Sequence, residues 1–309
     1  YDINDLGIIF YTNYHAALAS ASYRILNPTK IFNTLKIEQE LNLELQNTTG
    51  KTQEAWYKTV VKATSLNNDY FELGFVVSPL ETFDFYEPRE YGRYVYIPKR
   101  IASYFGFELN RNNALTFDMT PSFTKYDEKG RFNYGIYASP KYRFNDKLSL
   151  AYALEYTKMK NDRGWVDFDN AGVVFTERNR EILQNDLTGK YSLNNKMTIN
   201  LTARYYWSYS KTHDFFTLQN NGYLTPNSNY TLNKNRNFNS WNFDLSYSWW
   251  FAPGSEISIL YRNYGLQRAS VVEKDLSKNL KNIFNSDLTN VLSVSIRYFI
   301  DYNSVKNKF

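Results

Sequence analysis

The chain has 309 residues, of which 18% are aromatic and 22% charged, and its formal net charge is +5. It contains no cysteine, which excludes disulfide bonds and thiolate metal sites, and no apolar run approaches the roughly 18–20 residues of a membrane-spanning helix. Its 36 basic and 31 acidic residues are interspersed, so the charge does not indicate nucleic acid as a partner.

Alternation of apolar and polar residues predicts strands along nearly the whole chain. In "MTINLTARYYWSYS", every second residue from Met197 to Tyr209 is apolar or aromatic, and a side-chain period of two is that of a β-strand. Most of these segments exceed the common strand length of about five or six residues. In chain order, the predicted strands are 9–26, 31–46, 54–66, 69–79, 94–109, 114–126, 131–144, 147–160, 173–193, 196–217, 234–251, 255–270 and 288–302.

Short and long connections alternate between these strands. Tight polar turns such as "NPTK", "LNND", "FNDK" and "APGS" occur at every second junction. The longer loops between them are 46–54, 78–94, 161–172, 211–233 and 269–287. In the last loop, Leu276, Leu280 and Ile283 have helical spacing, which predicts a short helix at the extracellular rim.

These features predict one all-β domain over residues 1–309, a transmembrane antiparallel up-and-down β-barrel of outer-membrane type with about thirteen strands. Strands cross hydrocarbon only as a closed barrel, because every backbone polar group there must be paired. The apolar face would contact lipid and the polar face would line the lumen, with aromatic residues near strand ends at the headgroup level. The alternative is a soluble β-sandwich or curved sheet, which would expose long rows of Tyr and Trp to water.

The odd number of strands adds a further expectation. If the tight turns are periplasmic, the C-terminus is periplasmic, the long loops are extracellular and Tyr1 lies outside. Bacterial single-chain barrels normally have an even number of strands and periplasmic termini. We therefore expect either that the barrel is incomplete at the N-terminus, with at least one further strand upstream, or that one strand is miscounted.

Three segments carry a resemblance to a known family. They are the opening "YDINDLGII", the hairpin "WWFAPGSEISILYR" at 249–262 and the ending "LSVSIRYFIDYN" at 292–303. They resemble the C-terminal part of a Bacteroidetes outer-membrane family of unknown function, in which a periplasmic carbohydrate-binding-like β-sandwich precedes a large barrel. The resemblance implies that the sandwich and the first barrel strands are absent here, and it brings no catalytic residues. The C-terminal half of a TonB-dependent receptor barrel is a second relative to consider, although the sequence contains no recognisable plug domain.

Charged residues on the polar side of the predicted strands are candidates for lining the lumen. They are Lys36, Glu38, Glu40, Glu44, Lys141, Arg143, Glu155, Lys190, Arg204, Asp244 and Arg297. Mutual neutralisation inside the lumen is the simplest role for these charges, and contact with a substrate is the alternative. A glycoside hydrolase would need two carboxylates about 5 to 10 Å apart at a defined sugar site, which scattered charges do not indicate.

We predict no catalytic residue, metal site or cofactor. The chain has only two histidines, His15 and His213, and no GxSxG, HExxH or phosphate-loop motif. Asp167 and Asp169 have a spacing found in calcium loops, but the other ligands of such a loop are missing, so a polar turn is the simpler interpretation.

Two aromatic segments are candidates for contact with the cell surface. "YGRYVYIPKR" at 91–100 joins aromatic and basic residues, which favours an interfacial girdle or anionic lipopolysaccharide over nucleic acid. Tyr223 and Tyr230, in an Asn-rich loop, could stack against glycans, although a solvated loop is the simpler interpretation.

The sequence therefore favours a non-enzymatic barrel of the bacterial outer membrane with a transport, channel or scaffold role. A subunit of an outer-membrane export or assembly complex and an outer-membrane enzyme acting on glycan or lipid stay open as alternatives. The expected partners are outer-membrane lipid and lipopolysaccharide, together with other outer-membrane proteins or lipoproteins. Nucleic acid is not an expected partner.

Overall fold

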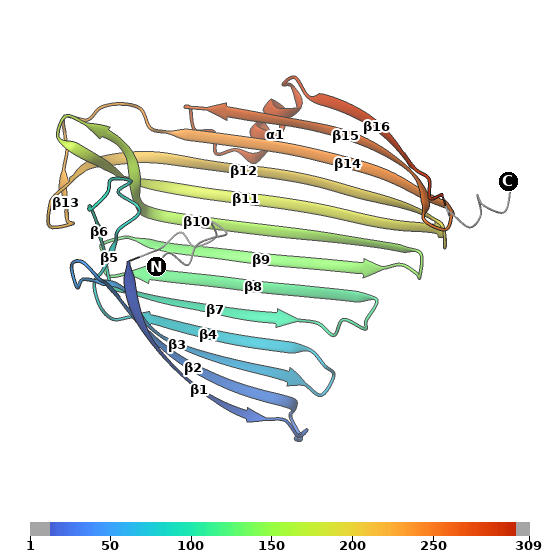
Figure 1. Ribbon diagram of the computed structural model, residues 1–309, viewed down its shortest axis with the longest axis horizontal. Coiled ribbons are helices and arrows are strands. Elements are labelled where there is room, and N and C mark those ends of the chain that lie inside the picture. Colours follow the sequence, from blue (N-terminus) through green and yellow to red (C-terminus); the bar gives the residue numbers. More distant parts are fainter. Residues whose placement is uncertain (1–12, 301–309) are drawn as a thin grey trace.

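The structure is a computed structural model that describes residues 13–300. It contains sixteen strands and one helix within that range (Figure 1). The strands are β1 (Tyr14–Ile25), β2 (Phe32–Gln46), β3 (Thr52–Ser65), β4 (Tyr70–Ser78), β5 (Thr82–Asp84), β6 (Val95–Ile97), β7 (Arg100–Glu108), β8 (Leu115–Tyr126), β9 (Phe132–Arg143), β10 (Leu148–Asp169), β11 (Gly172–Asn194), β12 (Met197–Leu218), β13 (Leu224–Pro226), β14 (Arg236–Ala252), β15 (Ser255–Ala269) and β16 (Thr289–Arg297). The helix is α1 (Leu276–Phe284).

The main sheet is an up-and-down antiparallel meander. Its order is β1-β2-β3-β4-β7-β8-β9-β10-β11-β12-β14-β15-β16, with the short β13 beside β12, which makes 14 strands. β5 and β6 form a separate two-stranded hairpin. The tight turns lie at one end of the sheet, here called the turn end, and the opposite end is the loop end (Figure 1). The predicted all-β meander is confirmed, whereas the sheet formed by residues 13–300 is open, with β1 and β16 as its unpaired edges.

Two predicted boundaries were wrong for local backbone reasons. The segment 161–172 is not a loop, because β10 continues to Asp169 and β11 begins at Gly172. Bulges between Met159 and Asp162, and again near Trp165, shift the register there. An extra residue at a bulge breaks the alternation of period two from which a strand is recognised.

The predicted strand 94–109 is divided in the structure. Residues Val95–Ile97 pair with β5, and β7 begins only at Arg100. Pro98 stands between them, and proline has no backbone N–H to donate to a sheet ladder. The first part of the predicted strand therefore leaves the main sheet and joins the β5–β6 hairpin.

The two faces of the sheet differ in polarity because residues in register share a face. One row runs from Leu201 through Leu245 and Tyr261 to Leu292, and the last three are 41%, 38% and 71% exposed. The neighbouring row on the other face contains Asp244 paired in register with Arg262. Within residues 13–300, the sheet therefore has a polar face and an apolar face, and much of the apolar face is not covered by another layer of the protein.

Helix α1 covers part of the apolar face at the loop end, which confirms the predicted helix. The side chain of Asp275 caps it by accepting hydrogen bonds from the N–H groups of Ser277 and Lys278. Ile283 is fully buried and packs with Tyr205 and Trp207 of β12. These two aromatic residues, expected at the lipid headgroups, are therefore enclosed by protein.

No helix among residues 13–300 has the length and apolar character needed to cross a membrane.

Candidate functional site

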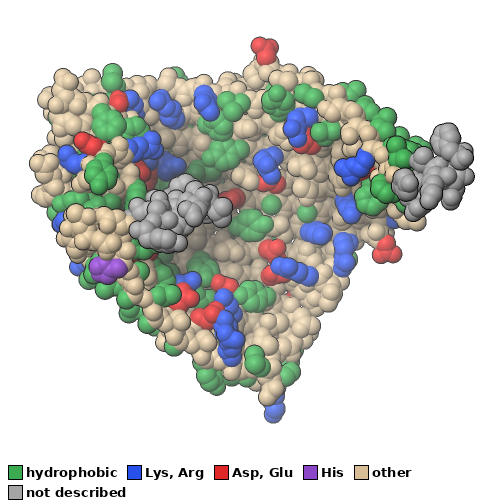
Figure 2. Space-filling view, viewed as in Figure 1, with side chains coloured by type: hydrophobic (Ala, Val, Ile, Leu, Met, Phe, Trp, Pro, Cys, Tyr) green, Lys and Arg blue, Asp and Glu red, His purple; other side chains and the backbone are tan. Residues whose placement is uncertain are grey.

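The polar face contains all eleven charged residues that the sequence singled out. The antiparallel register places them at positions of the same parity in β2, β9, β10, β11, β12, β14 and β16. Figure 2 shows basic and acidic side chains gathered on the hollowed side of the molecule. The alternation of side chains along each strand was sufficient to predict that these eleven residues share a face. That they line a lumen stays a prediction.

Ion pairs join neighbouring strands on the first part of this face. Glu38 of β2 pairs with Lys36 and with Lys62 of β3, whose Nζ lies 2.7 Å from the carboxylate. Glu40 pairs with Lys58 at 3.6 Å. Because each carboxylate here has at least one cation beside it, these residues form a neutralised surface and not a pair of free acids.

A second set of ion pairs lies on β11, β12, β14 and β15. Arg204 pairs with Asp186, and Arg262 donates two hydrogen bonds of 2.7 and 2.8 Å to the carboxylate of Asp244. Such a bidentate contact holds both side chains in a fixed orientation. Arg143 instead donates to the backbone carbonyls of residues 112 and 113.

The remaining candidates are not joined into a cluster. Within residues 13–300, Lys141, Glu155, Lys190 and Arg297 form no ion pair, and Glu44 lines a cavity described below. The same range holds no group of three or more His, Asp or Glu side chains arranged to bind a metal ion.

The inner loop, defined as residues 79–99, folds over the polar face at the loop end. It contains the β5–β6 hairpin, and with β2, β3 and β4 it encloses a cavity of about 210 Å³. Glu44 and Glu54 line this cavity from the sheet, and Asp84 lines it from the loop. The ammonium group of Lys51 lies 4.3 Å from the ring centre of Phe83, which adds a cation–π contact.

The other side of the inner loop is bound to distant strands. Arg93 donates a hydrogen bond of 2.7 Å to the carbonyl of Leu218, and the N–H of Tyr96 donates to the carbonyl of Gly222 at 2.8 Å. Val95 is buried in a cluster with Phe175 and Leu218. Four strands of the main sheet, β4, β7, β8 and β9, lie between β3 and β10. The inner loop therefore ties together two parts of the curved sheet that are not neighbours.

Two of the three aromatic residues of 91–100, Tyr94 and Tyr96, pack against other rings, whereas Tyr91 is fully exposed. Tyr94 contacts Phe83 with ring centres 5.4 Å apart, and Tyr96 stacks on Tyr223 at 5.0 Å. Tyr94 and Tyr96 thus take part in packing within the protein, and the expected interfacial girdle or lipopolysaccharide contact of 91–100 stays a prediction. The contact between Tyr96 and Tyr223 has no signature in the sequence, because the two residues lie about 130 positions apart.

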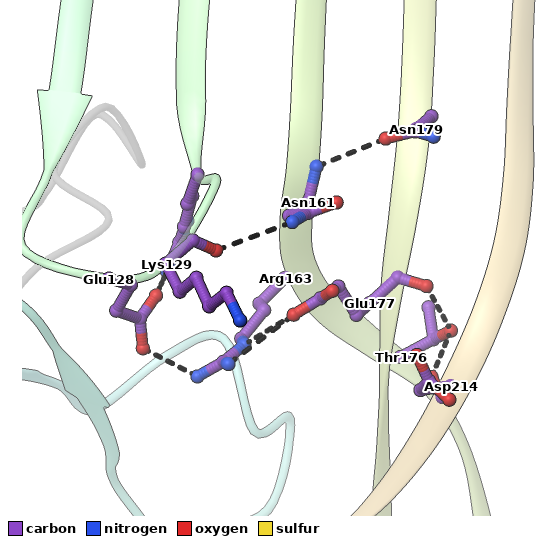
Figure 3. A network of polar contacts seen from close by, with 9 residues as sticks. Glu128, Lys129, Asn161, Arg163, Thr176, Glu177, Asn179 and Asp214 are labelled. Atoms are coloured by element: carbon purple, nitrogen blue, oxygen red, sulfur yellow. Dashed lines mark hydrogen bonds and ion pairs between the residues drawn. The ribbon is translucent and has the colours of Figure 1, made fainter.

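A polar network at the loop end holds the long β10–β11 hairpin in place (Figure 3). Arg163 of β10 donates to Glu128 at 2.6 Å and to Glu177 of β11 at 3.3 Å. The side chain of Asn161 donates to the carbonyl of Lys129 at 3.4 Å. Because Glu128 and Lys129 belong to the β8–β9 turn, the network connects that turn with both strands of the hairpin.

Asp167 lies in β10 and not in the polar turn that the sequence predicted. It is near the loop end of β10, where it accepts hydrogen bonds of 2.6 Å from both Tyr230 and Lys234. These two donors, Lys234 first, lower the pKa of the Asp167 carboxyl to about 2. Tyr230 is 8% exposed and packs on Phe215, so its ring is not free to stack against a glycan.

The protein is an all-β protein whose main sheet is a long antiparallel meander with one apolar and one charged face. The chain belongs to the family described as a domain of unknown function (DUF5916), whose model matches residues 1–309. No curated protein matches the chain. This agrees with the uncharacterised family expected from the sequence, and the Bacteroidetes and outer-membrane origin of the chain stays a prediction.

Proposed function

We propose that the sheet forms the wall of a β-barrel in the bacterial outer membrane, with the polar face toward the lumen and a non-enzymatic transport, channel or scaffold role. The observation that carries this proposal is the uncovered apolar face, with rows such as Leu245, Tyr261 and Leu292. Hydrocarbon would solvate such rows, whereas water would leave an aggregation-prone surface. The resemblance of 249–262 to a Bacteroidetes outer-membrane family supports the same location.

The length of the strands indicates which part of the sheet would lie in the membrane. β10, β11 and β12 have 22, 23 and 22 residues. A strand that crosses a bilayer needs only about 9–11 residues, so roughly half of each would lie outside. The exposed apolar residues Leu150, Leu187 and Leu245 belong to the halves near the turn end. We place the bilayer there, and Asp167, the inner loop and α1 then lie beyond it.

The inner loop would act as a constriction at the outer mouth of the lumen. Its contacts with Leu218 and Gly222 hold it against β12 and the following segment, and its cavity side faces Glu44 and Glu54. A polar solute entering from outside would pass between this loop and the charged face. The ion pairs along that face would offer both donors and acceptors to the solute.

Reconstitution of the full-length gene product in planar bilayers tests this proposal. We expect single-channel currents, and a larger conductance when residues 82–96 are replaced by a short Gly-Ser linker. Replacement of Arg93 by Ala is the milder variant, which frees the loop without removing it. A protein that inserts into vesicles but passes no current in any form would contradict the channel and leave the scaffold role, and failure to insert would overturn the membrane location itself.

A role as a subunit of an export or assembly complex is the second candidate. The observation that favours it is that β1 and β16 have unpaired edges within residues 13–300, and an exposed edge can pair with another strand. Purification of the full-length protein in mild detergent should then yield stoichiometric partners, whereas an isolated protein would count against it. For the enzymatic alternative, unchanged turnover of glycan or lipid in Glu38→Gln, Glu40→Gln and Glu44→Gln would remove these three carboxylates as candidates.

A further inference from the structure

A second cavity, of about 390 Å³, lies where β10, β11, β12 and β14 approach the loop end. Its lining includes five cationic side chains, and we call it the basic cavity. These residues are Arg89, Arg178, Arg180, Lys234 and Arg236. Arg180, Ser210 and Arg236 are in register on β11, β12 and β14, so their side chains project from the polar face beside one another.

Two carboxylates neutralise part of this charge. Asp162 accepts a hydrogen bond of 3.0 Å from Arg178 and one of 3.3 Å from Arg180. Asp167 pairs with Lys234 at 2.6 Å. The carboxylate of Asp162 thus accepts hydrogen bonds from two guanidinium groups, those of Arg178 and Arg180. Several of their N–H donors therefore make no hydrogen bond to it.

The other two arginines have no acidic partner among residues 13–300. Arg236 donates to the backbone carbonyl of Asn235, and the guanidinium of Arg89 lies 4.2 Å from the ring centre of Trp165. Glu87 of the inner loop accepts a hydrogen bond from the N–H of Trp165 and forms no ion pair in that range. The cavity therefore carries an excess of positive charge, unlike the ion pairs that Glu38, Asp186 and Asp244 form on the same face.

Positive charges gathered in a concavity attract an anion, because the low-dielectric walls concentrate their field. Guanidinium groups present forked N–H donors that match the oxygens of a phosphate. Ser208 and Ser210, which also line the cavity, add hydroxyl groups between the arginines. We propose that the basic cavity binds a phosphate monoester, held by Arg178, Arg180 and Arg236.

The site is built from one continuous part of the sheet and the inner loop, so it does not depend on closure of a barrel. A phosphate monoester could reach it as a small soluble solute or as the phosphate of a lipid-linked sugar at the cell surface. The chemistry of recognition is the same in both cases, and competition between the two sources distinguishes them.

Calorimetric titration of the detergent-solubilised protein tests the proposal, with glycerol 3-phosphate, inorganic phosphate, glycerol and citrate as probes at about 0.15 M salt. The double variant Arg180→Gln with Arg236→Gln should bind glycerol 3-phosphate at least about tenfold more weakly than the wild type. The matched control, Lys141→Gln with Lys190→Gln, removes two cations from the same face near the turn end and should bind like the wild type. Soluble lipid A competing with glycerol 3-phosphate would identify the lipid-linked source, and its failure to compete would identify the soluble one.

Three results would overturn the proposal. The first is equal weakening in the two double variants, which would mean that overall charge and not this cavity binds the anion. The second is binding of citrate as tight as that of glycerol 3-phosphate. The third is a total absence of binding in a wild-type protein that inserts into vesicles, which would refute the site while leaving the proposed membrane location intact. Thermal unfolding of each variant excludes a loss caused by misfolding. The double variant Arg180→Lys with Arg236→Lys retains the charge and serves as a second control.

Discussion

Asn279 of α1 accepts a hydrogen bond of 2.9 Å from the side-chain amide of Asn239 on β14, and both side chains are fully buried. Asn237 donates to the same oxygen at 2.8 Å, and Asn239 in turn accepts from the hydroxyl of Tyr205 at 2.8 Å. A buried amide group without a hydrogen-bond partner lowers the stability of the folded state. This network therefore defines the position of α1 on the sheet more closely than apolar contacts alone would.

Replacement of Asn279 by Ala should loosen α1. It leaves the amide donors of Asn237 and Asn239 without their acceptor, and each buried unpaired group costs about 1–3 kcal/mol. We expect a lower free energy of unfolding in urea and faster proteolysis within 270–288. The control is Lys278→Ala on the exposed side of the helix, whose side chain is 65% exposed. Equal proteolysis of the two variants would show that the amide network does not hold the helix.

Acid should release the loop of residues 227–235 only at low pH. Hydrogen bonds from Lys234 and Tyr230 lower the pKa of Asp167 to about 2, so the folded state favours its ionised form. The stabilisation from this group is therefore complete above its ordinary pKa near 3.9, and it is lost as the pH falls toward about 2.

A spin label at Asn229→Cys, in a chain that otherwise has no cysteine, reports this release. The label should stay immobile from pH 7 to pH 4 and become mobile as the pH approaches 2. In the variant Asp167→Asn the label should be mobile at every pH, whereas Asp146→Asn, in the turn before β10, should behave like the wild type. Mobility that sets in near pH 4 in the wild type would contradict the lowered pKa.

Gly74 and Gly106 should respond differently to Ala. A methyl group at Gly74 of β4 would overlap the ring of Tyr104, whereas one at Gly106 of β7 would find its nearest atom, Cβ of Glu72, at 3.4 Å. We expect Gly74→Ala to cost about 1–3 kcal/mol of unfolding free energy through overpacking. Gly106→Ala should be neutral or stabilising by up to about 1 kcal/mol, because it reduces the freedom of the unfolded chain.

A double-mutant cycle tests the cause at Gly74. Combining Gly74→Ala with Tyr104→Ala should cost less than the sum of the two single changes, because the overlapping ring is gone. Additive costs would show that the ring is not what excludes a side chain from position 74.

Arginine placed on the two faces of β14 should separate lipid from water as the environment of the apolar face. Leu245 is on the apolar face and its neighbour Ser246 is on the polar face. In lipid vesicles, Leu245→Arg should cost about 2–4 kcal/mol near the middle of the bilayer, and less if the site lies closer to an interface. Ser246→Arg should stay within about 1 kcal/mol of the wild type, because it faces a polar environment. Equal costs in urea titrations of the two variants would mean that water solvates both faces.

Local alternation was enough to predict most of the sheet. Along β12, the pattern from Met197 onward gives both the strand and its two faces, because successive side chains of a strand always point to opposite sides. The same rule placed Arg204 and Asp244 on one face before any pairing was known. The spacing of Leu276, Leu280 and Ile283 likewise predicted α1, because an amphipathic helix repeats about every 3.6 residues.

The second half of β10, residues 161–169, was not predicted as a strand because its backbone departs from regular geometry. Asn161 has φ 53°, and the bulge beside it shifts the register of the residues that follow. Past such a point, the sequence reads as a polar loop although the hydrogen-bonded ladder continues. The sequence pattern therefore predicts a loop at Arg163 and Asp167, although these residues hold the hairpin and the following segment in place.

Most of the strands, the tight turns, α1 and the charge of each face could be predicted from the amino-acid order alone, because all of these depend on residues close together in the chain. The packing of the inner loop and of α1 depends instead on contacts between distant parts of the chain. The hydroxyl of Tyr223 reaches the carboxylate of Glu81 across 142 residues, and Tyr205 is buried by a helix from another part of the chain. Such contacts depend on the curvature that many twisted strands accumulate together, and no single segment encodes that curvature.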